Sequence, residues 1–333
     1  MKAITLPATR PGSRILGTGA YRPERVVSNA EICELIDSSD EWIRERSGII
    51  ERRYAAADES VTDMAMEASG KALASAGVAA TDIDTVLVAT ITHPYQTPSA
   101  SAELADRLGT HKAAALDVAA ACAGFCYALA QADALVRAGS STYVLVVGVE
   151  KLTDIVDFTD RGTSFIFADG AGAVVVGPAD QPGIGPVVWG SDGAQKDAIT
   201  MTQSWAQYRR APADKWPALT MQGQAVYRWA VGEMADVCRR TVAAAGLTLD
   251  DLDVFVPHQA NMRITDSLLR QLSLPDHVVV SRDIATTGNT SAASVPLALD
   301  ALVSSGQARS GAIALLVGFG AGLAYAAQVV TLP

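Results

Sequence analysis

The chain has 333 residues, of which 49% are hydrophobic, and its 26 basic and 36 acidic side chains give a formal net charge of −10. This length holds one large core or two packed halves, and the acidic balance argues against nucleic acid as the main partner. The two most apolar stretches, residues 118–130 and 312–327, are rich in alanine and glycine, which predicts buried core rather than a membrane span.

In chain order, segments typical of strands alternate with segments typical of helices, beginning with a strand at residues 13–17. Residues 76–88 show a helix end, a glycine stop, an Asp-rich turn and a buried strand, and residues 245–257 repeat this pattern. Two further pairs follow in the same order and at nearly the same offset: 133–139 with 300–306, and 145–148 with 315–318. These collinear pairs predict a duplicated α/β unit.

The duplication predicts two halves, residues 1–180 and 181–333, each with a mostly parallel sheet covered by helices. The active site is then expected between them. Shifting Cys122 by the same offset leads to Ser291, two residues from Asn289. We therefore expect strand-to-helix junctions of both halves to face one cleft.

Cys122 is the most reactive-looking residue of the chain. The four cysteines form no CxxC pair and no segment is typical of a secretory leader, so we expect free thiols and a cytoplasmic protein. An extended run at residues 114–118 leads into a helix-forming segment at Cys122. A helix N-terminus favours a thiolate, which is a nucleophile. Cys126, one turn further along, fits core packing.

Three segments are candidate partners of this thiol, and each also has a purely structural explanation. The chain contains four histidines: His93, His111, His258 and His277. His258 follows a buried strand, where a structural histidine also fits. Asn289 lies in a Gly-Asn-Thr-Ser sequence, which is also typical of an Asx turn or a helix N-cap. Residues 318–322, Gly-Phe-Gly-Ala-Gly, fit either a tight turn or a loop whose backbone N–H groups face a ligand.

Together these segments resemble the β-ketoacyl-acyl-carrier-protein synthase III family of the thiolase superfamily. The family's Cys-His-Asn triad matches Ala-Cys-Ala-Gly-Phe at 121–125, Pro-His-Gln-Ala-Asn at 257–261 and Gly-Asn-Thr-Ser at 288–291. Further matches lie at 40–49, 160–163 and 167–173. The resemblance runs from about Arg14 to Pro333 and is closest in style to actinobacterial members. It implies an α/β protein with the duplicated, five-layer α-β-α-β-α thiolase-like fold, and a homodimer.

The resemblance implies a decarboxylative condensation of an acyl-CoA with malonyl-acyl carrier protein, which initiates fatty acid synthesis. Cys122 is then expected to attack the thioester and carry the acyl group. The backbone N–H of Cys122 and one from Gly320 or Ala321 are the expected oxyanion donors. His258 Nε2 and Asn289 Nδ2 are expected to donate to the malonyl thioester oxygen. No cofactor and no metal are expected, since the CoA thioester and the phosphopantetheine carrier are substrates.

The resemblance also implies which residues bind CoA: Trp42, Arg46, Arg161, Gln224, Tyr227 and Asn261. Trp42 is expected to stack on the adenine, with Arg161 on the other face and Arg46 near the nucleotide. The segment at 221–227, which contains Gln224 and Tyr227, resembles the wall of the family's pantetheine tunnel.

Two further roles follow from the resemblance. Arg263, with Arg228 as a second candidate, is expected to bind the acidic acyl carrier protein. Thr97, just before Pro98, is expected to reach across the dimer into the partner's acyl pocket. Because some relatives carry phenylalanine there, threonine predicts tolerance of longer or branched acyl chains.

Three alternatives remain open. A starter-unit ketosynthase of a polyketide pathway would share every motif above. An acyl-CoA acyltransferase of the same fold, acting on a small hydroxyl or amine, is disfavoured by Asn289 and Arg263. A non-catalytic partner subunit would lack the nucleophile, so Cys122, His258 and Asn289 argue against it.

Overall fold

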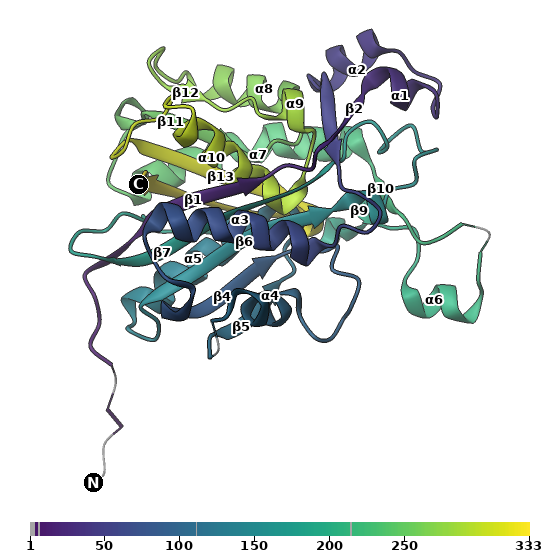
Figure 1. The fold of residues 1–333 in the computed structure, drawn as a ribbon. Helices are drawn as coiled ribbons and strands as arrows, with labels where there is room; N and C mark the ends of the chain where they lie inside the picture. Colours follow the sequence, from purple (N-terminus) through teal and green to yellow (C-terminus); the bar gives the residue numbers. More distant parts are fainter. Residues whose placement is uncertain (1–3, 6, 111, 214) are drawn as a thin grey trace.

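Two five-stranded sheets organise the chain (Figure 1). The computed structural model describes residues 4–5, 7–110, 112–213 and 215–333, so His111 lies outside the described residues. The strands of the first sheet, in spatial order, are β1 (Gly12–Tyr21), β7 (Asp169–Ala179), β6 (Tyr143–Lys151), β4 (Ile83–Ala89) and β5 (Ala114–Val118). Those of the second are β8 (Val188–Gly190), β14 (Ala324–Thr331), β13 (Ile313–Gly320), β11 (Val254–Pro257) and β12 (Val279–Val280).

The two sheets have the same topology. In the first, β4 pairs in parallel with β5 and β6, whereas β7 pairs antiparallel with β6 and β1. In the second, β11, β12 and β13 are parallel, whereas β14 is antiparallel to β13 and β8. The expectation of mostly parallel sheets is therefore wrong. The turn between β13 and β14 is too short for the crossover that a parallel pair needs, so the chain reverses there.

Helices form three layers around these sheets, which completes the expected five-layer fold (Figure 1). On the outer face of the first sheet lie α3 (Val61–Ala76) and α4 (Ala100–Leu108). On the outer face of the second lie α7 (Gly223–Ala244) and α8 (Met262–Leu272). Between the sheets lie α5 (Gly124–Arg137) and α10 (Ser294–Ser304), whose apolar residues form one core with both sheets. A helix that is apolar nearly all round is buried in this way.

The predicted duplication falls on equivalent elements, because β6 corresponds to β13 and α5 to α10. Each of these helices follows a short 3-10 turn, η2 (Ala121–Ala123) or η6 (Ser291–Ala293). The first residue of each turn is left-handed, with φ 44° at Ala121 and 49° at Ser291. Ala292 is therefore the structural counterpart of Cys122.

Each turn packs against a strand of the other half. A side chain at Gly148 of β6 would collide with the carbonyl oxygen of Ala292, and one at Gly318 of β13 would lie 3.2 Å from the carbonyl oxygen of Cys122. Glycine thus permits the close approach of backbone on both sides of the molecule. The nucleophile's turn is held in place by the second half of the chain.

Smaller elements cover one end of the sheets and share a separate apolar core. They are β2 (Arg25–Ser28), α1 (Asn29–Cys33), α2 (Asp40–Ser47), β3 (Glu51–Tyr54), η3 (Leu152–Asp154), β9 (Ile199–Met201), β10 (Leu219–Met221) and α9 (Ile284–Thr287). The remaining 3-10 turns are η1 (Ala80–Asp82), η4 (Gly193–Ala198), η5 (Leu249–Asp251) and η7 (Ala321–Leu323).

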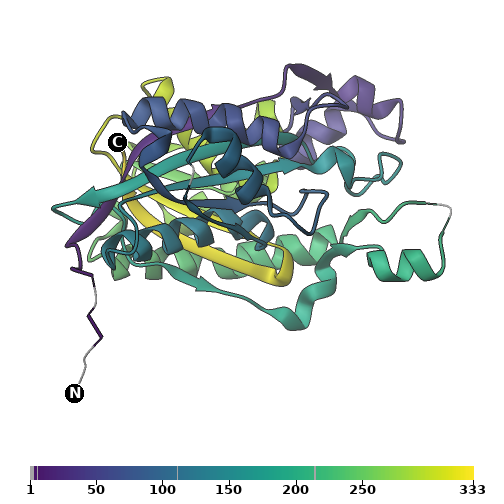
Figure 2. The same cartoon turned by 60° about the horizontal axis from the view of Figure 1, so that its bottom comes forward.

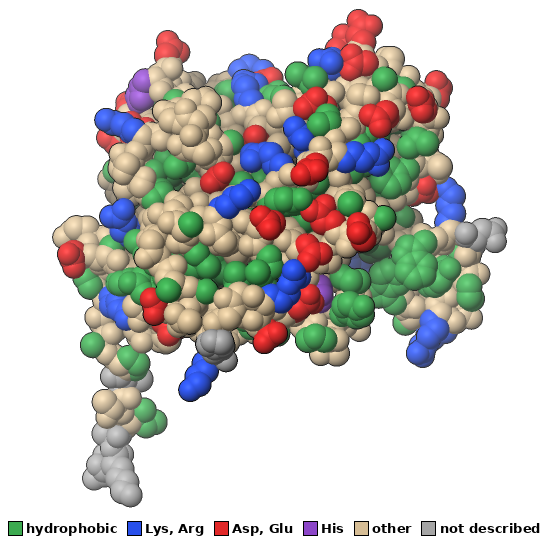
Figure 3. Space-filling model, in the orientation of Figure 1, with side chains coloured by type: hydrophobic (Ala, Val, Ile, Leu, Met, Phe, Trp, Pro, Cys, Tyr) green, Lys and Arg blue, Asp and Glu red, His purple; other side chains and the backbone are tan. Residues whose placement is uncertain are grey.

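An arm that carries α6 (Trp205–Arg210) projects from the body (Figures 1 and 2). Trp205 and Trp216, which are about half exposed, pack against each other with ring centroids 5.0 Å apart and ring planes tilted by 47°. Hydrophobic side chains gather where the arm meets the body (Figure 3). None of the helices in the described ranges is long and apolar enough to cross a membrane.

Candidate active site

A cavity of about 560 Å³ extends to the two paired turns. The predicted site residues that line it are Trp42, Arg46, Cys122, Arg161, Gln224, Tyr227, Arg228, His258, Asn261, Arg263, Asn289, Gly320 and Ala321. Thr97 is the exception: it is exposed on the segment between β4 and α4. Among the residues that the structure describes, no three or more His, Cys, Asp or Glu side chains are grouped to hold a metal ion.

Cys122 lies where β5 gives way to α5, as predicted. The strand ends at Val118, Ala121 turns the chain in the left-handed region, and α5 begins at Gly124. The Ala123 N–H donates to the Ala120 carbonyl at 3.1 Å, which closes the turn. The Cys122 side chain is almost completely buried at the inner end of the cavity.

The protonation state of Cys122 is not the predicted one. Burial raises the pKa of its thiol to about 11, a nearby Glu150 carboxyl also raises it, and hydrogen bonds from Ser291 and two backbone N–H groups lower it. A helix terminus stabilises a charge by about 1 kcal/mol, less than one pKa unit, whereas full burial shifts a pKa by several units. The expected thiolate is therefore wrong for the protein alone, because burial outweighs the helix.

We expect alkylation of Cys122 by iodoacetamide to be slow at pH 7 and to rise about tenfold per pH unit up to pH 10, because only the thiolate reacts. The rate can be followed on the Cys122 peptide by mass spectrometry, with N-acetylcysteine as the reference thiol. A rate that levels off near pH 7 would contradict the raised pKa.

Two backbone N–H groups face the Cys122 sulfur, those of Cys122 itself and Ala321. Of the two loop residues predicted as oxyanion donors, Ala321 is thus the one whose N–H points to the nucleophile. Gly320 has a different part: a Cβ there would lie 2.7 Å from Cys122 Cβ and 2.9 Å from its sulfur. Any larger residue at position 320 would therefore displace the Cys122 side chain.

His258 follows β11 and is held as a neutral ring. Its Nδ1 lies 2.6 Å from Ser294 Oγ, which also accepts the Gln259 N–H at 3.4 Å. The Ser294 proton is therefore available to Nδ1, which places the ring hydrogen on Nε2. Burial lowers the pKa of His258 to about 3, and Phe319 packs edge-on with ring centroids 5.2 Å apart. The ring is thus arranged to donate a hydrogen bond from Nε2.

Asn289 is fixed by its backbone and by one side-chain bond. Its N–H donates to the Ile166 carbonyl and its own carbonyl accepts from the Ala168 N–H, both at 2.9 Å. Its Oδ1 accepts the Ser291 N–H at 2.9 Å. Because the oxygen is engaged, the Nδ2 group is the part of the amide left to donate into the cavity.

Aromatic and guanidinium groups meet at the outer end of the cavity. Arg161 lies over the Trp42 ring, 4.8 Å from its centroid, and Arg46 lies 5.9 Å from it. These are the three residues predicted to hold the nucleotide. No ring fits between Arg161 and Trp42 at this spacing, so an adenine that binds there must displace Arg161.

The other carrier candidates lie between α7 and α8. Arg263 lies over the Tyr227 ring at 5.2 Å, and Arg228 and Gln224 are exposed on α7. Asn261 caps α8 by accepting the Arg263 N–H, and it donates to the Arg46 carbonyl, both at 2.9 Å. Asn261 therefore ties the two helices that carry Arg46 and Arg263.

Residues that sequence reasoning did not select as site residues also surround the nucleophile: Glu150, Ser291, Ser294 and Phe319. Glu150 had one usable signal, since a Glu-Lys pair ends an otherwise apolar strand. Ser291 marks the counterpart of the Cys122 turn in the duplication. Nothing in the sequence distinguishes Ser294 from an ordinary helix N-terminal serine.

Comparison with known proteins agrees with this geometry. Residues 116–193 match the model of 3-oxoacyl-[acyl-carrier-protein] synthase III, and residues 242–332 match that of its C-terminal part. The chain is 58% identical to β-ketoacyl-[acyl-carrier-protein] synthase III 1 of Streptomyces coelicolor, over 97% of each chain. It is 53% identical to the mycobacterial β-ketoacyl-[acyl-carrier-protein] synthase III of Mycobacterium tuberculosis, over 99% of each chain.

Among solved structures, the priming β-ketosynthase of the R1128 polyketide pathway superposes with a TM-score of 0.98 at 52% identity, over 100% of this chain and 99% of that one. The 3-oxoacyl-[acyl-carrier-protein] synthase III of Aquifex aeolicus superposes with a TM-score of 0.88 at 35% identity, over 96% of this chain and all of that one.

Proposed function

The chain belongs to the β-ketoacyl-acyl-carrier-protein synthase III family, and we propose that its cavity condenses an acyl-CoA with malonyl-acyl carrier protein to initiate fatty acid synthesis. It is an acyltransferase of the condensing type. One observation carries the proposal: a buried thiol, two backbone N–H groups and two side-chain N–H donors line the same cavity.

In the first half-reaction Cys122 attacks the acyl-CoA thioester and keeps the acyl group. The negative charge of the tetrahedral intermediate falls on the former carbonyl oxygen, and the N–H groups of Cys122 and Ala321 stabilise it. These N–H groups need no reorganisation, because the η2 and η7 turns already fix them. CoA then leaves, and the acyl-enzyme waits for the second substrate.

In the second half-reaction the malonyl group loses CO₂ and becomes an enolate that attacks the acyl-Cys122 thioester. Charge develops on the malonyl thioester oxygen, where His258 Nε2 and Asn289 Nδ2 donate. His258 serves as a donor rather than a base, in keeping with its lowered pKa. A carboxylate in place of Asn289 would oppose the same charge.

The carriers enter past the basic end of the cavity. Although the chain is acidic overall, Arg46, Arg161, Arg228 and Arg263 line the cavity. Guanidinium groups bind phosphates bidentately and stack on aromatic faces, so they suit the phosphates of CoA and the acidic acyl carrier protein.

We expect Trp42→Ala to raise KM for acyl-CoA about tenfold with a smaller change in kcat, because stacking and cation–π contacts contribute about 1–2 kcal/mol. The matched substrate is the same acyl group on pantetheine, which lacks the nucleotide. Its KM should not change, and an equal rise for both substrates would show that Trp42 does not contact the nucleotide.

We also propose that the enzyme acts as a cytoplasmic homodimer with no bound cofactor. β5 is an edge strand of the first sheet, and Leu116 on it is 40% exposed. On the segment that follows β4, Ile91 and Tyr95 are also exposed, at 37% and 66%. An apolar sheet edge of this kind favours pairing with another chain. Thr97 lies on the same segment, where a partner's acyl pocket would meet it.

Thr97→Phe is expected to restrict the primer. The ratio of kcat/KM for hexanoyl-CoA to that for acetyl-CoA should fall about tenfold or more, since a bulky ring fills space that threonine leaves. Thr97→Ser, which removes only a methyl group, should keep the wild-type ratio. An unchanged ratio in Thr97→Phe would remove this residue from the acyl pocket.

The proposal is tested by following the two half-reactions separately. The protein is incubated with a panel of acyl-CoAs and acylation of Cys122 is read by mass spectrometry; malonyl-acyl carrier protein is then added. We expect discharge of the acyl group with release of CO₂, and no acylation of Cys122→Ala. Acylation without condensation would defeat the proposal.

A second candidate, a starter-unit ketosynthase of a polyketide pathway, is favoured by the superposition on the R1128 priming β-ketosynthase. Both candidates use the same chemistry. They differ in the carrier protein, so comparing kcat/KM with malonyl groups on fatty acid and polyketide carrier proteins separates them.

A further inference from the structure

A completely buried arginine lies behind the wall of the cavity, and neither half-reaction described above uses it. This residue, Arg52, is on β3. Its Nη2 donates to Asn29 Oδ1 at 2.6 Å and to the Phe165 carbonyl at 3.0 Å. Its Nη1 donates to the Val27 carbonyl at 3.3 Å. The guanidinium therefore ties β3 both to the junction of β2 and α1 and to the segment that carries Phe165.

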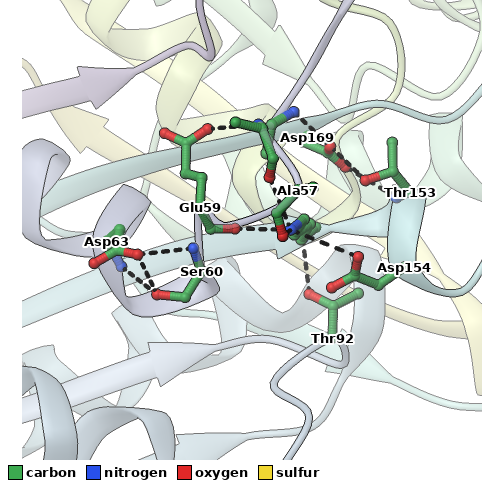
Figure 4. A network of polar contacts seen from close by, with 11 residues as sticks. Ala57, Glu59, Ser60, Asp63, Thr92, Thr153, Asp154 and Asp169 are labelled. Atoms are coloured by element: carbon green, nitrogen blue, oxygen red, sulfur yellow. Dashed lines mark hydrogen bonds and ion pairs between the residues drawn. The ribbon is translucent and has the colours of Figure 1, made fainter.

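The charge of Arg52 is matched by neutral oxygens. Among the residues that the structure describes, no Asp or Glu forms an ion pair with it. Asp169, a buried acid at the start of β7, accepts instead from the Thr153 hydroxyl and N–H (Figure 4) and from the Ala55 N–H. Hydrogen bonds to a buried charge are strong and costly to lose. Arg52 therefore resists any displacement of its three acceptors.

Phe165 connects Arg52 to the nucleotide end of the cavity. Its ring lies edge-on against the Trp42 ring, with centroids 5.2 Å apart and planes at 72°, and both side chains line the cavity. An adenine that binds on Trp42 must displace Arg161, which then no longer holds the indole. Phe165 stays in contact with the indole, and its backbone is held in turn by Arg52.

A second route runs from Arg52 to the helix that carries Trp42. Only the oxygen of the Asn29 amide can accept from a guanidinium, so the amide nitrogen is turned the other way. It donates to Asp40 Oδ1 at 2.7 Å and to the Ile49 carbonyl at 2.9 Å. Asp40 is the first residue of α2 and Ile49 lies two residues beyond its last. One amide, oriented by Arg52, therefore holds both ends of this helix.

We propose that Arg52 is a positioning residue for the nucleotide of the acyl-CoA, because it sets the place of Trp42. It holds Phe165 directly and α2 through Asn29. The inference rests on the proposed function, since it concerns the end of the cavity where CoA is proposed to bind. Arg52 itself does not line the cavity, so it acts through these neighbours rather than on the substrate.

The first test uses Arg52→Met, which removes the charge and its hydrogen bonds but keeps an unbranched chain. Methionine also keeps the Cβ that packs beside Gly288, where an added Cβ would lie 2.9 Å from it, so Asn289 should stay in place. We expect the Kd of CoA, measured by isothermal titration calorimetry, to rise about tenfold, as for loss of the Trp42 contact itself.

Steady-state kinetics separate positioning from a purely structural role. In Arg52→Met, KM for acetyl-CoA should rise about tenfold and kcat should change less than about threefold. KM for acetyl-pantetheine, which lacks the nucleotide, should not change. A purely structural role would instead lower the folded fraction, which reduces the apparent kcat for both substrates and leaves each KM as it is.

A double-mutant cycle tests whether Arg52 acts through Trp42. If it does, Arg52→Met combined with Trp42→Ala binds CoA as weakly as Trp42→Ala alone, because the contact that Arg52 supports is already lost. Fully additive effects would overturn the proposal. Arg53→Met is the matched control: it removes the next arginine of β3, which is partly exposed, and should keep wild-type values.

A second set of variants decides the question if Arg52→Met does not fold. Asp40→Ala breaks an exposed ion pair with Arg44 and also the bond from Asn29, whereas Arg44→Ala breaks only the ion pair. At about 0.3 M salt, which screens exposed charges, CoA affinity should fall about threefold in Asp40→Ala. It should stay at the wild-type value in Arg44→Ala and in Asp40→Asn, whose amide oxygen still accepts from Asn29.

Wild-type CoA affinity in Arg52→Met, or in Asp40→Ala where Arg52→Met does not fold, would overturn the proposal. An equal rise in KM for acetyl-CoA and acetyl-pantetheine would do the same, since the effect would then not concern the nucleotide. A wild-type protein that neither binds CoA nor is acylated by any acyl-CoA would refute the proposed function, and this inference with it.

Discussion

Asn289→Asp is expected to abolish condensation while Cys122 is still acylated. Asn289 Oδ1 accepts the Ser291 N–H, so the substituted carboxylate would keep one oxygen there and turn the other to the cavity. A donor is thereby replaced by a negative charge at the point where the enolate forms. Losing one such donor costs about 10²–10³-fold in kcat, and repulsion adds to this. Acylation, which uses the N–H groups of Cys122 and Ala321, should change less than about tenfold.

The control for this variant is Asn289→Ala, which removes the donor without adding a charge. It should condense more slowly than wild type but faster than Asn289→Asp. The measurements are the rate of Cys122 acylation and the rate of CO₂ release from malonyl-acyl carrier protein. Equal loss of both rates in Asn289→Asp would place Asn289 in the first half-reaction as well.

Gly320→Ala is expected to inactivate both half-reactions. The backbone at Gly320 is extended, so alanine brings no backbone strain, but its Cβ would lie 2.7 Å from Cys122 Cβ and 2.9 Å from the sulfur. Real carbon atoms do not approach so closely, and Cys122 must move. A displacement of about 1 Å at a reacting centre costs about 10²-fold in rate, and overpacking lowers stability by about 1–3 kcal/mol.

Gly232→Ala is the matched control, because an added Cβ on this exposed part of α7 meets open space. It should leave acylation unchanged and stabilise the helix by about 0.5–1 kcal/mol. Acylation rates and thermal unfolding of both variants check the expectation. A fully active Gly320→Ala would mean that the nucleophile does not need its present position.

The duplication was predictable because the residues of a buried strand must fit the elements that pack on it. Residues 145–148 and 315–318 share an apolar run that ends in glycine, and both glycines make room for the opposite turn. Helix caps and turns depend on neighbouring residues in the sequence, so the helix end, turn and strand at 76–88 could be predicted as well. The division at residue 180 stays a prediction. The direction of the strands could not be predicted, since alternating strands and helices also fit a sheet in which β13 and β14 pair antiparallel.

The candidate site was predictable as a set of residues but not as an electrostatic environment. The family motifs bring Cys122, His258 and Asn289 into one cavity. The raised pKa of Cys122 depends on burial and on Glu150, which belong to the assembled core rather than to any local motif. The Nε2–H form of His258 depends in the same way on Ser294, a residue from another element.

The two matched turns also bear on ancestry. A chain of two identical halves would hold two equivalent turns, each completed by a strand of the opposite half, and so two equivalent places for a nucleophile. In the present chain only one of these places carries a cysteine, and Ala292 stands in the other. The second turn instead donates the Ser291 N–H to Asn289 Oδ1 and the Ser291 hydroxyl to Glu150. The two copies therefore build one centre with unlike sides rather than two equivalent ones.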